Sequence, residues 1–155
     1  MCSSSGSTFA HRPGVADRPA GDRLVRALAA IDAANGEDPN HVVVDGVERP
    51  KELAHADLMT AWVTRLDPGA DDAQLLAARA HHLRRWTLPR DAYPDGRVGY
   101  LRWRARQKRR HAEEVAAILS AVGYDEATVA RVQAIVAKQG LGSDPAVQTL
   151  SLIHI

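Results

Sequence analysis

The stretch that decides the fold is "VGYLRWRARQKRRHAEEVAAILSAV", residues 98–122. It contains no proline and is followed by Gly123, which is typical of a long helix that ends at a glycine. Its second half places Val115, Ile118 and Val122 on one face. Continued toward the N-terminus, the same face carries His111, Lys108, Arg104 and Tyr100. We expect one helix whose inward face changes from apolar to polar.

The rest of the chain shows the same helical spacing of apolar residues. We expect a first helix capped by Asp22, a second from Pro50, a third from about Asp71 to Trp86, and a last one that follows Asp125. The second carries an apolar stripe of Leu58, Met59, Trp62, Val63 and Leu66. The segment "HVVVDGVERP", with its Asp-Gly pair, predicts either one short hairpin or an extended connection near 41–48.

Length and composition favour one all-α domain. The chain has 155 residues, of which 45% are hydrophobic and only one is phenylalanine. Residues 1–21, rich in Ser, Gly and Pro, are expected to be disordered, and 22–149 to form the helical domain. A single Cys2 excludes an intrachain disulfide, and no apolar run approaches the roughly 20 residues needed to cross a bilayer. We expect a cytoplasmic protein without membrane contact.

Charge is distributed unevenly along a chain whose formal net charge is only +1. The region 84–110 holds ten Lys and Arg residues against two acidic ones, Asp91 and Asp95. Such a stretch suggests an anionic partner, either a small molecule or RNA. The alternative is a solvated helix face with intramolecular ion pairs.

Three histidines, His55, His82 and His111, fall on the inward faces of three predicted helices, whereas His81 points more to the side. Helical bundles assemble metal sites from such distant residues, and imidazole suits zinc, iron or nickel. The three therefore form a candidate set for a divalent metal. The alternative is that each is a buried histidine bonded to a neighbour.

Arginine, lysine and aromatic residues suggest a second kind of site, for phosphate. Arg104, Lys108 and His111 share one helix face, and arginine forks match phosphate oxygens. Trp86 and Trp103 are expected either to stack on a ligand or to lie in the core.

Several segments carry a resemblance to a known family: "VDGVERPKEL", "LAARAHHLRRWTLPRDAYPDGRVGYLRWR", "KRRHAEEVAAIL" and "GYDEATVARVQAIVAKQGL". From about Asp22 to Leu150 the chain resembles the domain of unknown function 4202 family, which implies no settled activity. More loosely, it is similar to the HD-domain metal-dependent phosphohydrolases. That resemblance implies a helical domain of HD-like type with His55 as the first histidine and His82 as the histidine of the His-Asp pair.

The chain departs from the HD pattern at two positions. Leu83 replaces the paired aspartate, and Lys138 stands where another ligand is expected. Leucine cannot coordinate a metal, and a lysine ammonium repels a cation. We therefore expect a metal-free phosphate pocket made from His82, Arg85, Arg104, Lys108, His111 and Lys138.

The last six residues, "LSLIHI" (150–155), match one reading frame of a transposase adapter used in sequencing libraries. We expect this tail to be non-native and the domain to be incomplete at its C-terminus. Loss of a closing helix would expose Val129, Val132 and Val136 as a patch.

The functional expectation is a domain that binds, and in a longer protein hydrolyses, a phosphate-bearing small molecule. The alternative is a non-enzymatic RNA or protein interaction module that uses the basic 84–110 surface. The sequence leaves the substrate, the reaction and the oligomeric state open.

Overall fold

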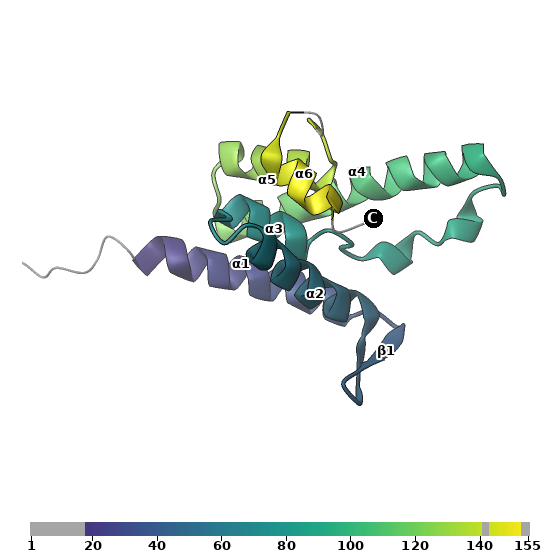
Figure 1. Ribbon diagram of the computed structural model, residues 1–155, viewed down its shortest axis with the longest axis horizontal. Helices are drawn as coiled ribbons and strands as arrows, with labels where there is room; N and C mark the ends of the chain where they lie inside the picture. The colour runs from purple at the N-terminus through teal and green to yellow at the C-terminus, as the bar shows by residue number, and fades with distance from the viewer. Residues whose placement is uncertain (1–17, 141–142, 153–155) are drawn as a thin grey trace, which may run out of the picture.

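The computed structural model describes residues 18–140 and 143–152, and Figure 1 shows them as a helical domain with one small hairpin. The elements are α1 (Arg18–Gly36), β1 (His41–Val44), β2 (Val47–Pro50), α2 (Lys51–Leu66), α3 (Asp72–Arg79), the 3₁₀ helices η1 (Arg85–Thr87) and η2 (Arg90–Ala92), α4 (Arg97–Val122), α5 (Glu126–Val136) and α6 (Pro145–Leu152). The all-α class is confirmed. Within the described residues, no helix has the length and apolar character that crossing a bilayer requires.

The short helix α3 lies at the centre, packed against α1, α2 and α5. Its Leu76, Ala77 and Ala78 are fully buried. Alanines on several sides of one helix let three neighbours approach closely. The helix starts with a capping box, in which Asp71 Oδ1 accepts from the Gln74 N–H at 2.9 Å and Gln74 Oε1 accepts from the Asp71 N–H at 3.1 Å.

The end of α3 differs from the sequence prediction. The helix stops at Arg79, and residues 80–84 form a turn. Side chains of α1 and α4 bind carbonyl groups at and after this end. Asn35 Nδ2 donates to the Arg79 carbonyl at 3.4 Å, and His111 Nδ1 lies 2.8 Å from the Leu83 carbonyl oxygen. The Gln107 amide donates to the carbonyls of Arg85 and Leu88, beyond the turn.

The start of α1 also differs from the prediction. The helix begins at Arg18, so 18–21, expected to be disordered, are helical. Pro19 is tolerated there because the first N–H groups of a helix have no intrahelical partner. Residues 1–17 lie outside the described part of the chain, so the expectation for them stays a prediction.

The segment after α1 forms a hairpin, one of the two predicted alternatives. β1 and β2 are antiparallel, with Val44 opposite Val47. Asp45 and Gly46, at φ 51° and 78°, form the two-residue turn. Two successive positive φ values match the twist of the strands, and Asp-Gly adopts them readily.

The buried face of α2 is only partly the predicted one. Met59 and Val63 are buried as expected, but Leu58, Trp62 and Leu66 are 40–55% exposed. The helix is rotated because α1 and α3 pack on the side that carries its small residues, and the buried set is Glu52, Ala56, Met59 and Val63. The stripe expected from the larger residues is therefore wrong in part.

The C-terminal helix α6 packs against α5 and α2, with Val147 and Leu150 buried. The α5 residues expected to form an exposed patch are instead nearly inaccessible: Val129, Val132 and Val136 are 0–9% exposed. That expectation is wrong. Residues 153–155 lie outside the described part of the chain, so the non-native origin of 150–155 stays a prediction.

Candidate anion-binding pocket and histidine cluster

A pocket of about 250 Å³ lies between the turn after α3, the first half of α4 and the end of α5. Its described lining residues are His81, His82, Arg85, Tyr100, Trp103, Arg104, Gln107, Lys108, His111, Val136 and Lys138. The set includes all six residues that the sequence analysis assigned to a phosphate site. It includes no aspartate or glutamate.

In the first half of the long helix α4, the buried face lies one position away from the predicted inward face. Trp103 and Gln107 are buried, whereas Tyr100 and Arg104 are exposed and Lys108 is half-buried. The Trp103 Nε1–H donates to the Leu88 carbonyl at 2.9 Å. Trp103 thus holds the segment before α4 against the helix through this hydrogen bond. Tyr100, Arg104 and Lys108 form the rim of the pocket.

Arg85 enters the pocket from η1. Its Nη1 lies 3.0 Å from His82 Nε2, and its guanidinium carbon lies 5.2 Å from the centre of the Trp103 ring. The preceding residue, Arg84, has φ 50°, a left-handed conformation that is uncommon without glycine. This backbone turn directs Arg85 toward α4.

Two lysines complete the basic lining. Burial, with Arg104 beside it, lowers the pKa of Lys108, and burial together with Lys108 and Arg104 lowers the pKa of Lys138. Lys138 follows α5 with φ 56°, the conformation that usually ends a helix with glycine. Both pKa values fall because the cations lie near one another in a partly desolvated space.

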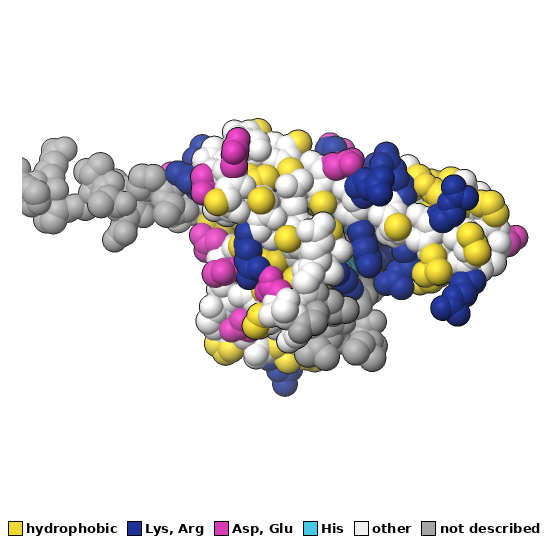
Figure 2. All heavy atoms as spheres, turned by 90° about the horizontal axis from the view of Figure 1, so that it is seen from above, with side chains coloured by type: hydrophobic (Ala, Val, Ile, Leu, Met, Phe, Trp, Pro, Cys, Tyr) yellow, Lys and Arg dark blue, Asp and Glu magenta, His cyan; other side chains and the backbone are white. Residues whose placement is uncertain are grey.

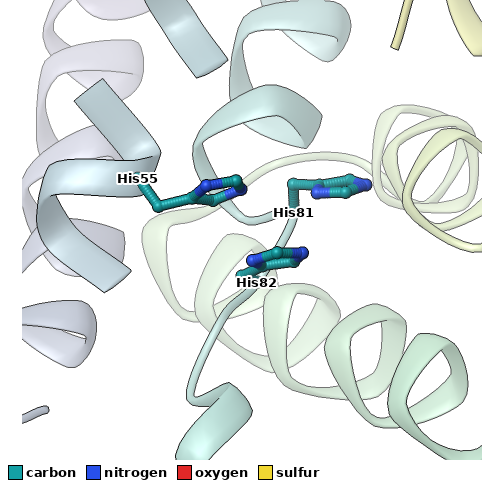
Figure 3. A group of neighbouring side chains, drawn as sticks. All are labelled: His55, His81 and His82. Atoms are coloured by element: carbon teal, nitrogen blue, oxygen red, sulfur yellow. The ribbon is translucent and has the colours of Figure 1, made fainter. Parts of the chain in front are cut away.

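Next to the pocket, His55 from α2 meets His81 and His82 from the turn after α3 (Figure 3). The His55 and His82 rings are stacked, with centroids 4.0 Å apart, and the His81 and His82 centroids are 4.8 Å apart. One ligand nitrogen of each residue lies within 4.8 Å of the others. Such a group could hold a metal ion.

The cluster differs from the predicted metal set, because His81 takes the place of His111. The His111 ring lies 6.3 Å from that of His82, and its Nδ1 is bonded to the Leu83 carbonyl. Burial lowers the pKa of His111 to about 4, so the ring is neutral at pH 7. His81, expected to point sideways, is only 7% exposed because the helix ends before it.

Glu52 is a site residue that sequence reasoning missed. Its Oε2 lies 3.2 Å from His82 Nδ1, and its backbone N–H donates to Asp38 Oδ2 at 3.0 Å. Burial raises the pKa of Glu52 to about 7. The signal was its position one helical turn before His55, which places both side chains on the same side of α2.

Arg85 Nη1 lies 3.0 Å from His82 Nε2 and 3.4 Å from Nδ1, and Glu52 Oε2 lies 3.2 Å from Nδ1. Burial, with the nearby cation and imidazoles, lowers the pKa of His82 strongly, so the ring is a neutral imidazole. The tautomer with its proton on Nδ1 satisfies an ionised Glu52 and the Arg85 guanidinium together, and it leaves Nε2 as the acceptor.

A family model described as "Domain of unknown function (DUF4202)" matches residues 25–153. The chain belongs to this family. Comparisons with curated proteins and with solved structures found no match. In this DUF4202 member, the matched range includes both the basic pocket and the histidine cluster. The expected likeness to HD-domain phosphohydrolases stays a prediction.

Proposed function

We propose that the domain binds a small phosphate-bearing molecule in the pocket between α4 and the end of α5. The observation that carries the proposal is the lining itself. Four cationic side chains gather there, and no aspartate or glutamate lines the pocket: Arg85, Arg104, Lys108 and Lys138. Within the described residues, none of the four forms a salt bridge. Several cations in a concave, partly dry site without acidic lining residues create a strong potential for an anion.

Hydrogen-bond chemistry supports the same ligand class. The guanidinium groups of Arg85 and Arg104 offer planar forks that match two phosphate oxygens, and the lysines add point charges. His111 uses Nδ1 on the Leu83 carbonyl, so Nε2 is the nitrogen it offers to a ligand. At about 250 Å³ the pocket is smaller than the roughly 300–1,000 Å³ of drug-sized sites, which favours a compact phosphate ester.

The test is calorimetric titration with inorganic phosphate, a sugar phosphate and a nucleoside monophosphate, in EDTA. Arg104→Ala should weaken the best ligand by roughly 1.5–3 kcal/mol, the range for hydrogen bonds to charged groups. Arg106→Ala is the matched control, since Arg106 is an exposed arginine on the same helix and is absent from the lining. Equal affinity in both variants would remove Arg104 from the site.

Hydrolysis of the bound ester is an extension of this proposal. It is measured as release of inorganic phosphate from the same ligands, with Arg104→Ala and Arg106→Ala in parallel. Activity that follows the binding defect of Arg104→Ala would place the reaction in the pocket. Binding without release would leave the domain a phosphate-ester binding module.

A second candidate function, RNA or protein binding by the 84–110 surface, is favoured by the distribution of charge. Figure 2 shows Lys and Arg gathered over the half of the molecule from which α4 projects, with most acidic side chains of this view on the other half. Arg102, Arg106 and Arg109 are exposed on α4 outside the pocket lining. Replacing all three by alanine should abolish RNA binding and its steep salt dependence, but leave phosphate binding in the pocket unchanged.

A further inference from the structure

We propose that His55, His81 and His82 form a binding site for one divalent transition-metal ion of the zinc type. This inference goes beyond phosphate binding, which the cationic pocket explains without a metal. Three potential ligand nitrogens within 4.8 Å of one another, from two separate elements, are the observation that carries it (Figure 3).

The donor set selects the class of metal. Imidazole nitrogen binds zinc, cobalt, nickel and copper well, whereas magnesium and calcium require oxygen ligands. Zinc–nitrogen bonds of about 2.0–2.1 Å in a tetrahedral site place ligand nitrogens roughly 3.4 Å apart. The spacing here is at most 4.8 Å. The His55 and His82 rings are stacked, so metal binding requires them to turn until both lone pairs point to one ion.

Glu52 supplies a second, independent observation. Metal-bound histidines usually donate their other ring N–H to a carboxylate, which fixes the tautomer and makes the ligand more basic. Glu52 Oε2 stands 3.2 Å from His82 Nδ1, which leaves Nε2 as the ligand atom of His82. The Glu52 backbone N–H donates to Oδ2 of Asp38, whose side chain is buried at 2% exposure. This bond fixes the helix turn that carries the Glu52 carboxylate.

The histidine cluster borders the basic pocket, and this position determines where the open coordination position of a bound metal would face. His81 and His82 also line the basic pocket, so three protein ligands would leave the fourth coordination position facing that space. A water molecule or a phosphate oxygen fits this position. Arg85 Nη1, now 3.0 Å from His82 Nε2, must leave that nitrogen when a metal binds. The guanidinium would then be available to an anion in the pocket.

The experiment is a cobalt titration of the chain after dialysis against EDTA and removal of the chelator, without phosphate. We expect one equivalent of Co²⁺ to bind with the visible absorption of a tetrahedral site, Zn²⁺ to displace it, and millimolar Mg²⁺ to have no effect. His55→Ala, His81→Ala and His82→Ala should each weaken binding at least a hundredfold. Glu52→Gln should weaken it 10–100-fold, the range for such supporting partners.

Two control variants separate this cluster from other histidines. His111→Asn removes a histidine outside the cluster while its amide can still donate to the Leu83 carbonyl, and His41→Ala removes an exposed histidine on β1. Both should bind cobalt like the unmodified chain. Equal loss in His41→Ala and His81→Ala, or binding of less than half an equivalent by the unmodified chain, would overturn the proposal.

A second measurement uses the unmodified chain, so it does not depend on whether the variants fold. NMR signals of the histidine ring nitrogens are followed while zinc is added. Signals of His55, His81 and His82 should shift together at one equivalent while that of His41 stays in place. Shifts spread over all histidines would overturn the site. Because phosphate binding is measured in EDTA and metal binding without phosphate, each proposal fails separately.

Discussion

Gly99 lies so close to Pro94 that a Cβ built on Gly99 would stand 1.8 Å from the Pro94 carbonyl oxygen. The first turn of α4 therefore rests directly on the backbone of the loop that precedes it. This contact positions the half of α4 that carries Trp103 and the basic rim of the pocket. Only glycine permits such an approach without movement of the backbone.

Gly99→Ala should therefore destabilise the domain. The methyl group meets backbone rather than a flexible side chain, so we expect a loss of about 2 kcal/mol in the free energy of unfolding, measured by urea denaturation. Gly21→Ala is the matched control, because Gly21 lies in α1 with no atom within 4 Å of its built Cβ. That change should leave stability unaltered or raise it by up to about 1 kcal/mol. Equal effects would contradict the contact.

Arg79 joins three helices through two carboxylates. Its Nε and Nη2 lie 2.6 and 2.7 Å from the oxygens of Asp32 in α1, and Nη2 lies 2.6 Å from Asp57 Oδ1 in α2. Arg79→Met should lower the free energy of unfolding by about 2 kcal/mol, because Asp32 loses its arginine and Asp57 keeps only Arg49. Arg26→Met, at an exposed arginine of α1, should change it by less than about 0.5 kcal/mol. Similar urea midpoints for both variants would argue against the network.

The helical class could be predicted from sequence, because the spacing of apolar residues indicates which face of a helix is buried. The residues at which helices end were harder to predict. Nothing in "AHHLRRW" stops a helix. At and after the end of α3, side chains of distant helices bind the backbone carbonyls: Asn35 that of Arg79, His111 that of Leu83 and Gln107 that of Arg85. Such tertiary competition leaves no local signal.

The candidate site could also be predicted only in part, because some of its residues are brought together by tertiary contacts that have no local sequence signal. The six pocket residues could be named because basic residues on an inward face are unusual, and the structure places them around one space. His81 and Glu52 were missed. His81 turns inward only because α3 ends early, and the role of Glu52 depends on a contact 30 residues away in the chain, to His82.

Lys138 allows stability and binding to be separated. Its left-handed backbone, φ 56°, is strained for lysine and relaxed for glycine. Lys138→Gly should raise the free energy of unfolding by up to about 1 kcal/mol while weakening phosphate-ester binding, because the pocket loses a cation. Calorimetric titration and urea denaturation of the same preparation measure the two effects. Affinity that stays constant or rises with stability would remove Lys138 from the site.

His111 gives the domain a pH-dependent stability with a definite sign. Its pKa is about 4 in the folded state, against 6.5 for an unperturbed histidine. As pH falls from 6.5 to 4, the unfolded chain takes up a proton that folded His111 does not, so its contribution to stability is progressively lost. The loss amounts to roughly 3 kcal/mol and ends below pH 4, where both states are protonated.

Glu52 acts in the opposite direction over an overlapping range. Its pKa of about 7 in the folded state lies above the usual 4.5, so the folded state holds the proton more tightly and stability rises as pH falls from 7 to 4.5. The effect of His111 must therefore be measured as a difference between two chains. His111→Asn is suitable, because its amide can donate to the Leu83 carbonyl as Nδ1 does but does not titrate.

Urea denaturation of both chains in EDTA, from pH 7.5 to 3.5, gives that difference. The unmodified chain should lose roughly 3 kcal/mol relative to His111→Asn across this range, with most of the change between pH 6.5 and 4. Comparing the two chains cancels the contributions of Glu52 and of the other titrating groups that the substitution leaves in place. Parallel profiles would mean that His111 titrates normally in the folded state, and that its ring is not held neutral by burial between α4 and the turn after α3.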